Sequence, residues 1–189
     1  MSPGERVVPR NPDSSDALFR VPTAADGTRM WEIARDSGVL DLNSSYAYVL
    51  WGAEFSESSV VVEVEGRVVG FVTGFIRPSE PDTIFVWQVG VDADQRGKGL
   101  AARLLHSLMD RLAERGVVRL RTTISPDNEA SQRTFGAVAR DRGMTLSDED
   151  YLSSELLGEG HEQEDLYTMS VLVLVSCVDS VMVFRSLHL

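Results

Sequence analysis

The chain has 189 residues, 43% of them hydrophobic and 25% charged, which suits one globular domain and excludes collagen-like, wholly disordered and disulfide-framework classes. Lysine and arginine number 18 and aspartate and glutamate 29, so the net charge is −11. This negative field repels nucleic acid and anionic membranes, and we expect neither as a partner. The single cysteine, Cys177, excludes an internal disulfide and a cysteine metal cluster. We therefore expect no metal and a cytoplasmic location.

The N-terminal third predicts a tail followed by two helices. Residues 1–16 are polar and proline-rich without apolar periodicity, which indicates a disordered tail. Apolar residues at helical spacing predict a first helix that begins after Asp26 and ends at Gly38. Residues 40–50 then have the pattern of a capped loop that enters a short helix.

Three β-rich runs follow. The runs 59–64 and 67–76 flank Glu65 and Gly66, and this arrangement predicts a β-hairpin. The third run, 83–91, is almost wholly apolar, which is typical of a strand that is covered on both faces.

The second half alternates helix and strand. Apolar residues at a spacing of 3.6 predict a helix over 98–115, and alternation over 117–124 predicts a strand. The crossover from run 83–91 through the long helix makes the two strands parallel. Asp127 or Asn128 then caps a further helix.

An acidic stretch closes the predicted domain, which we place at 17–169. From Ser147 to Asp165 there are eight acidic residues and no lysine or arginine. Such a run is either a solvated face or a source of carboxylates for a cationic ligand. The chain after it is expected to return as a strand, and 170–189 forms an apolar C-terminal extension of unknown role.

A glycine-rich turn joins run 83–91 to the long helix, with the sequence Gln95-Arg96-Gly97-Lys98-Gly99-Leu100. Its glycines allow a ligand to approach the backbone closely, and the helix start offers unpaired N–H groups. With the two basic side chains, they predict an anion site suited to a pyrophosphate. A P-loop is excluded, because Gly99 stands where the Ser or Thr that holds Mg²⁺ is needed. The dinucleotide pattern G-x-G-x-x-A fits, but it belongs to a first strand–helix unit and here three β-rich runs precede it.

The turn resembles the Q/R-x-x-G-x-G/A motif of the GCN5-related N-acetyltransferases (GNAT); the plain alternative is a glycine-rich turn with two solvated basic residues. The resemblance implies an α/β (α+β) GNAT fold, with a mostly antiparallel, twisted mixed sheet, a parallel pair at the acetyl-CoA cleft and flanking helices. It implies acetyl-CoA as cosubstrate, with its pyrophosphate on the amides from Gln95 to Leu100. It also implies a splayed strand near Val89 and Val91, where one N–H polarises the thioester carbonyl and stabilises the oxyanion. Asn128 resembles the family's contact to the pantetheine arm, although a simple helix cap is an equal interpretation and both can hold.

Four further stretches resemble the diaminobutyrate acetyltransferases of ectoine synthesis, a group within this family. They are 40–46, 81–89, 122–131 and 161–164, and together with the turn they follow the family order over 18–169. This resemblance implies acetyl transfer to the 4-amino group of L-2,4-diaminobutyrate, by a homodimer.

Such a substrate carries two ammonium groups and a carboxylate, and its amine must lose a proton before it attacks a thioester. The substrate-binding residues expected from the family motifs are Asp41, Tyr46, Trp87 and His161, with the ring face of Trp87 offered to a cation. Glu164 is the expected base, and Glu162 is the other catalytic candidate. From the residues alone, Asp41 also suits a helix cap, and Trp87 also suits an apolar core.

One position departs from the family pattern. Many GNAT enzymes place a tyrosine after the Asn-bearing helix start to protonate the departing thiolate, and Phe135 stands there in this chain. Substitutes for that tyrosine are Tyr46, Tyr151 or Tyr167. The departure keeps open a non-catalytic acetyl-CoA-binding module. A second alternative, an acetyltransferase of another small amine or a protein amine, also stays open and depends on whether Asp41, Tyr46, His161 and Glu164 form the substrate pocket.

Overall fold

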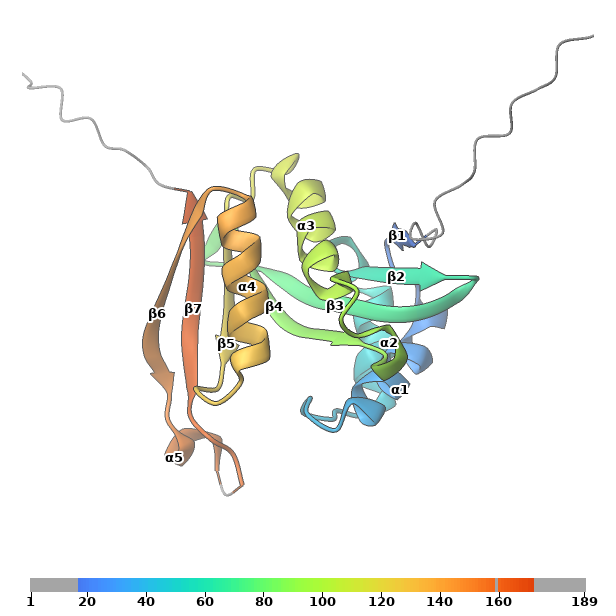
Figure 1. Ribbon diagram of the computed structural model, residues 1–189, viewed down its shortest axis with the longest axis horizontal. Helices are drawn as coiled ribbons and strands as arrows, with labels where there is room; N and C mark the ends of the chain where they lie inside the picture. Colours follow the sequence, from blue (N-terminus) through green and yellow to red (C-terminus); the bar gives the residue numbers. More distant parts are fainter. Residues whose placement is uncertain (1–16, 159, 172–189) are drawn as a thin grey trace, which may run out of the picture.

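The computed structural model describes residues 17–158 and 160–171, which form a seven-stranded sheet with helices on both faces (Figure 1). The strands are β1 (Leu18–Arg20), β2 (Val60–Val64), β3 (Arg67–Arg77), β4 (Glu80–Val91), β5 (Arg119–Ile124), β6 (Met144–Leu152) and β7 (Glu164–Val171). The helices are α1 (Gly27–Ser37), α2 (Ser45–Ala53), α3 (Leu100–Ala113), α4 (Glu129–Asp141) and α5 (Ser154–Leu157). None of the helices within the described ranges is long and apolar enough to cross a membrane.

The strand order is β1-β2-β3-β4-β5-β7-β6, and every neighbouring pair is antiparallel except β4 and β5. The predicted fold class, a mostly antiparallel mixed sheet with one parallel pair and flanking helices, is confirmed. The predicted hairpin joins β2 to β3, where Glu65 and Gly66 have φ values of 52° and 77°. Positive φ at both turn residues is the geometry of a two-residue hairpin whose twist matches its strands.

Two apolar cores lie on opposite faces of the sheet. The larger core packs α3 and α4 against strands β2 to β5, and its members include Val72, Ile84, Leu104, Leu108, Leu120 and Phe135. The smaller core lies between β2–β3 and the pair α1 and α2, and its members include Met30, Ile33, Tyr48 and Phe71. The long helix begins at Leu100, two residues later than predicted, because Gly97 and Gly99 both adopt left-handed backbone conformations.

A β-bulge interrupts β4. Thr73 pairs with Gln88 and the next residue, Gly74, pairs with Val86, so Trp87 is an extra residue on β4. Ile84 and Val86 face the larger core before the bulge, and Val89 and Val91 pack against that same core after it. Trp87 and Gln88 both turn towards α2, where they contact Trp51 and Tyr48. Both faces of this strand are covered, as predicted, by the larger core and by α2, although Phe85, Trp87 and Val89 stay partly exposed.

The strands β4 and β5 stay together only briefly. Their parallel pairing covers Thr83–Phe85 on β4 and Arg119–Arg121 on β5, and β4 then continues to Val91 without that partner. In Figure 1 the strands β2–β4 run across the view, whereas β5, β7 and β6 run up and down. The predicted splay near Val89 and Val91 is present, and it separates the two halves of the sheet.

The acidic stretch contains a strand that the sequence analysis missed. β6 pairs with β7 and forms the edge of the sheet, with Asp148, Glu149 and Asp150 exposed. Charged side chains on an edge strand oppose pairing with other chains, so part of this stretch is a solvated face. The predicted returning strand is β7, which reaches Val171. The predicted tail 1–16 and the extension after Val171 lie outside the described residues.

Candidate active site

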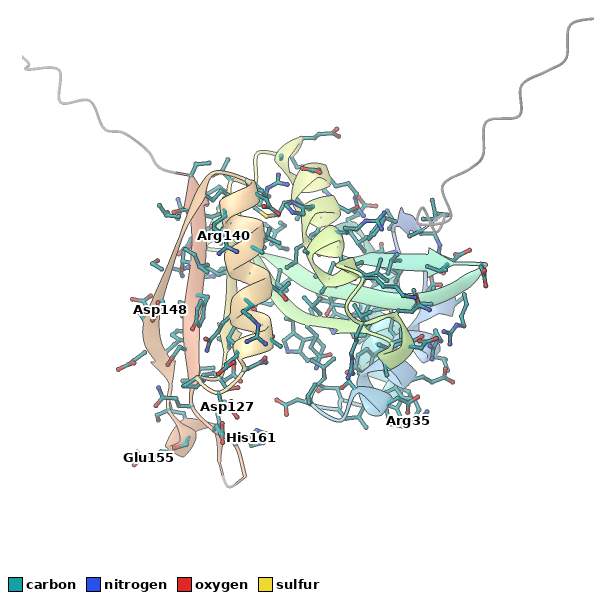
Figure 2. The ribbon with its side chains drawn as sticks, in the orientation of Figure 1. Arg35, Asp127, Arg140, Asp148, Glu155 and His161 are labelled. Carbon is teal, nitrogen blue, oxygen red and sulfur yellow. The ribbon has the colours of Figure 1, made fainter. Side chains whose placement is uncertain are left out.

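A cavity of about 780 Å³ lies where β4 and β5 separate. Its walls come from the α1–α2 loop (39–43), from β4 (85–89), from the end of β5 and start of α4 (122–128), and from the β6–β7 connection (160–164). In Figure 2 the labelled Asp127 and His161 lie near each other, where β5 ends and β7 begins. The four stretches that resemble diaminobutyrate acetyltransferases, 40–46, 81–89, 122–131 and 161–164, therefore all contribute to the wall of one cavity.

The cavity is acidic. Its described lining residues include the carboxylates Asp41, Asp127, Glu162 and Glu164 and contain no lysine or arginine. Charges of one sign in a partly enclosed cleft concentrate ligands of the opposite sign. The geometry therefore favours a cationic ligand, which agrees with the use of the acidic stretch as a carboxylate source.

Glu164 lies at the start of β7 and is half-buried. Burial raises the pKa of its carboxyl above the ordinary 4.5, and the negative charges of Asp41, Asp165 and Asp127 raise it further. The Thr123 hydroxyl partly offsets these effects. A carboxylate with a raised pKa is a stronger base than a solvated one, which suits proton removal from an ammonium group.

The structure brings three of the four predicted substrate contacts to the cavity. Asp41, Trp87 and His161 all line it, as does the second catalytic candidate, Glu162. Tyr46 does not line it: this residue lies in the first turn of α2 and is 67% exposed. Its role in substrate binding remains a prediction.

Trp87 belongs to an aromatic cluster as well as to the cavity wall. Its ring stacks on Trp51 with centroids 4.9 Å apart, and Trp51 in turn contacts Phe55 at 4.7 Å. Trp87 therefore packs against other aromatic rings, as a core residue does, and also faces the cavity, as a ligand contact must. A ring held on one side by Trp51 keeps a fixed orientation towards the cavity.

The glycine-rich turn has the geometry of an anion site. Gly97 and Gly99 have φ values of 77° and 71°, and a Cβ built on either would meet no atom within 4 Å, so the space beside the turn is open. The first hydrogen bond of α3 runs from the Arg103 N–H to the Gly99 carbonyl, so the N–H groups of residues 100–102 precede the helical ladder. These donors fit the pyrophosphate of acetyl-CoA, with Lys98 adding positive charge alongside.

The base of the turn is rigid. The Asp92 N–H donates to the Val69 carbonyl at 2.8 Å, and the Asp92 carboxylate is held by the guanidinium groups of Arg29 and Arg67. The side chain of Asp92 is only 11% exposed, so this ion pair is shielded from solvent more than a surface pair. A fixed base keeps the amides of the turn in place before a ligand arrives.

Asn128 and Phe135 both border the cavity from α4. The Asn128 side chain accepts a hydrogen bond from the Ser131 N–H at 3.0 Å, which confirms the helix cap and leaves the pantetheine contact a prediction. Phe135 is buried and has no proton to donate, and Tyr46, Tyr151 and Tyr167 are absent from the described lining.

Several polar lining residues were missed from the sequence. The hydroxyl-bearing ones are Thr122, Thr123, Ser125 and Ser131, and Gln88 adds an amide. Gln88 carried a usable signal, since it is the one amide side chain within the apolar run 83–91. Within the described residues no group of three or more His, Cys, Asp or Glu is placed to hold a metal.

The model of the Acetyltransferase (GNAT) family matches residues 28–137, more than half of the chain. The chain belongs to this family. As a family member it is an acyltransferase that uses acetyl-CoA, and the open turn described above is the site predicted for that cosubstrate.

Several individual members of the family are similar to this chain over most of its length. The L-2,4-diaminobutyric acid acetyltransferase of Streptomyces coelicolor is 53% identical over 161 residues, which are 84% of this chain and 95% of that one. The protein of the same name from Nocardia farcinica is 50% identical over 154 residues, 82% of this chain and 80% of that one. A solved structure of Paenibacillus lautus diaminobutyrate acetyltransferase EctA, in complex with L-2,4-diaminobutyric acid and coenzyme A, has a TM-score of 0.79. The two sequences are 40% identical, and the match covers 83% of this chain and 96% of the Paenibacillus lautus chain.

Gly99→Ala tests the turn, with Gly116→Ala as a matched control. Both glycines have positive φ and open space where the Cβ would lie, so each variant loses stability by ~1–2 kcal/mol from backbone strain alone. Only Gly99 borders the predicted ligand. We expect Gly99→Ala to weaken coenzyme A binding by about tenfold or more and Gly116→Ala to leave it unchanged, measured by titration calorimetry beside urea unfolding. Equal affinity in both variants would show that the ligand does not approach this turn.

Proposed function

We propose that this chain transfers the acetyl group of acetyl-CoA to the 4-amino group of L-2,4-diaminobutyrate, giving N4-acetyl-L-2,4-diaminobutyrate. We place this reaction in ectoine biosynthesis in the cytoplasm. The observation that carries the proposal is the match to the Paenibacillus lautus enzyme, whose structure holds diaminobutyric acid and coenzyme A. The acidic lining of the cavity supports it independently, because the substrate has two ammonium groups.

Different walls of the cavity contact different groups of such a substrate. Asp41, on the α1–α2 loop, offers a carboxylate to one ammonium group, and the ring of Trp87 offers an aromatic face to a cation, an interaction typically worth ~0.5–2 kcal/mol. His161 lies at the β6–β7 connection and is a candidate partner for the substrate carboxylate. These contacts together distinguish a short diamino acid from a simple amine.

Proton removal falls to Glu164 in this proposal. Its carboxylate lines the same cavity as Asp41 and has a raised pKa, so it accepts a proton from the attacking ammonium more readily than a solvated carboxylate does. Glu162 is the exposed alternative. Acetyl-CoA supplies the thioester carbonyl, and attack by the freed amine there forms the amide and releases coenzyme A.

The sheet supplies the remaining groups. Beyond Phe85 one edge of β4 has no pairing with β5, so N–H groups near Val89 and Val91 remain to polarise a carbonyl. A thiolate with a free pKa of ~8.5 can leave near neutral pH without an acid, so the absence of a tyrosine at Phe135 is compatible with turnover.

The direct test is coenzyme A release with acetyl-CoA and L-2,4-diaminobutyrate, with the acetylated position determined by NMR of the product. We expect the N4-acetyl product, formed in strong preference to products of ornithine and lysine, because a longer chain displaces one ammonium from its carboxylate. Release with a different amine only would support an acetyltransferase of another substrate. Coenzyme A binding without turnover on any amine would support a non-catalytic binding module.

Glu164→Gln tests the base. In the native enzyme the carboxylate form is lost as pH falls through its raised pKa, so the acidic limb of the kcat/KM profile lies above pH 4.5. We expect Glu164→Gln to lower kcat by about 10²–10⁴-fold and to abolish this limb. If the acidic limb persists in Glu164→Gln, a group other than Glu164 accepts the proton. Glu162→Gln is the matched control.

Unfolding measurements show whether the lower kcat of Glu164→Gln comes from damage to the fold. A carboxyl whose pKa is raised by folding opposes folding at pH values above that pKa, and the opposition disappears at low pH. At pH 7 we therefore expect Glu164→Gln to be at least as stable as the native chain.

We further propose that the enzyme is a homodimer, as its family resemblance implies. On β5 the side chains of Arg119, Arg121 and Thr123 alternate with the buried Leu120, Thr122 and Ile124 and so lie on the face opposite the larger core. The guanidinium groups of Arg119 and Arg121 are partly exposed on this face beside Asp82 and Glu80, so charged groups there are available to a second chain. Light scattering is expected to give twice the 20.8 kDa chain mass, and Arg121→Glu to give the monomer mass.

A further inference from the structure

We propose that Gln88 and Tyr48 are positioning residues for the substrate: they fix the α1–α2 loop against the β4 bulge and thereby hold Asp41 at the cavity. This inference rests on the proposed function, since it concerns the loop that carries the ammonium contact. Both residues act through the loop, because the two ends of the Gln88 amide are already bonded to Tyr48 and to the Asp41 carbonyl.

The two side chains form a buried polar pair. Tyr48 is 0% exposed within the smaller apolar core, and Gln88 is 7% exposed beside it. The Tyr48 hydroxyl donates to Gln88 Oε1 at 2.9 Å. Burial raises the pKa of Tyr48 above 10, so the phenol keeps its proton and remains a donor. Buried polar groups are costly unless they are hydrogen-bonded, so a pair at this depth indicates a specific task.

The task is to hold the loop. Gln88 Nε2 donates to the Asp41 carbonyl at 2.7 Å, across 47 positions of sequence. Because that carbonyl is an acceptor only, Gln88 must present its amide N–H₂ to the loop and its oxygen to Tyr48. The orientation of the amide is thus determined from both sides, and the loop backbone is fixed at the residue whose carboxylate lines the cavity.

The loop has few other anchors. Residues 41–44 form no helix or strand, and Val39 is 81% exposed. The Leu40 N–H donates to the Ser37 hydroxyl at 3.1 Å, and Trp31 Nε1 donates to the Asn43 carbonyl at 3.1 Å. Gln88 provides the anchor between these two points. The Asn43 side-chain amide also donates to the Asp41 carbonyl, at 3.5 Å, but it belongs to the loop itself, so Gln88 is the contact that ties Asp41 to the sheet.

The bulge explains why a strand residue can reach the loop. Side chains on a regular strand alternate, so Trp87 and Gln88 would face opposite sides of the sheet. The extra residue at Trp87 turns both towards α2, where one stacks on Trp51 and the other binds Tyr48. The same irregularity therefore places an aromatic wall and the anchor of the facing loop side by side.

Steady-state kinetics test the inference, with each substrate varied in turn. We expect Gln88→Met to raise the KM for diaminobutyrate by about tenfold, because both the Tyr48 hydroxyl and the Asp41 carbonyl lose a buried partner. The KM for acetyl-CoA is expected to stay unchanged, since the turn at 95–100 is untouched. Tyr48→Phe is expected to act in the same direction with a smaller effect, and the double variant to be no worse than Gln88→Met alone.

Thr83→Val is the matched control. Thr83 is a fully buried hydroxyl on the same strand, bonded to Asp82 and remote from the loop, so its removal is expected to change neither KM. Hydrogen exchange supplies a readout without turnover: amides of residues 39–44 are expected to exchange faster in Gln88→Met and Tyr48→Phe than in Thr83→Val.

The outcomes are distinct. Equal increases in both KM values, or unchanged exchange at 39–44, would overturn the positioning role. If Gln88→Met does not fold, Tyr48→Phe decides alone, because it removes a single oxygen atom. A native enzyme that ignores diaminobutyrate would refute the proposed function, whereas faster exchange at 39–44 in the variants would still show that Gln88 and Tyr48 anchor the loop.

Discussion

The separation of β4 from β5 is the constraint on which the rest of the site depends. The parallel pairing ends at Phe85 and Arg121, while β4 continues for six more residues and remains paired with β3 on its other edge. The open edge presents backbone donors that a neighbouring strand would otherwise have taken. The gap also creates the 780 Å³ cavity, and it allows elements from both halves of the sheet to contribute side chains to one space.

The acidic lining has an energetic consequence. Asp41, Asp127 and Glu164 lie close enough for their charges to raise the pKa of Glu164, so the empty cavity at neutral pH contains mutual repulsion. A ligand with two positive charges relieves that repulsion as it binds, and by linkage its binding stabilises the folded state. The charge of Glu164 therefore opposes folding at neutral pH, and the acidic lining of the cavity favours a diammonium ligand over a neutral amine. Raised pKa values of this origin are typical of functional sites.

The sequence patterns predicted those elements whose signals are local. The hairpin at Glu65-Gly66, the cap at Asn128 and the glycine-rich turn at 95–100 each depend on residues adjacent in the chain, and all three are present in the structure. β6 escaped prediction because its acidic residues have low strand propensity, and its place at the sheet edge comes from pairing with β7.

Features that depend on distant contacts were the least predictable. The bulge at Trp87 follows from the register between β3 and β4, and no pattern within β4 alone indicates it. Tyr48 and Gln88 are 40 positions apart, so their hydrogen bond is invisible to any spacing rule. Likewise, the pKa of Glu164 is raised first by burial and then by charges that include Asp41 and Asp127, and both causes arise only in the folded chain.

These differences follow from how each half of the site is built. In our proposal the acetyl-CoA half uses backbone N–H groups at a turn and at an open strand edge, so its main sequence requirement is glycine at two left-handed positions. The proposed substrate half would use side chains from a loop, a bulged strand and the β6–β7 connection, where buried hydrogen bonds such as those of Gln88 hold the chain in place. A backbone site tolerates wide variation around it and therefore suits a whole family that shares one cosubstrate. A side-chain site can be altered residue by residue, and this is where an acetyltransferase acquires preference for one amine over another.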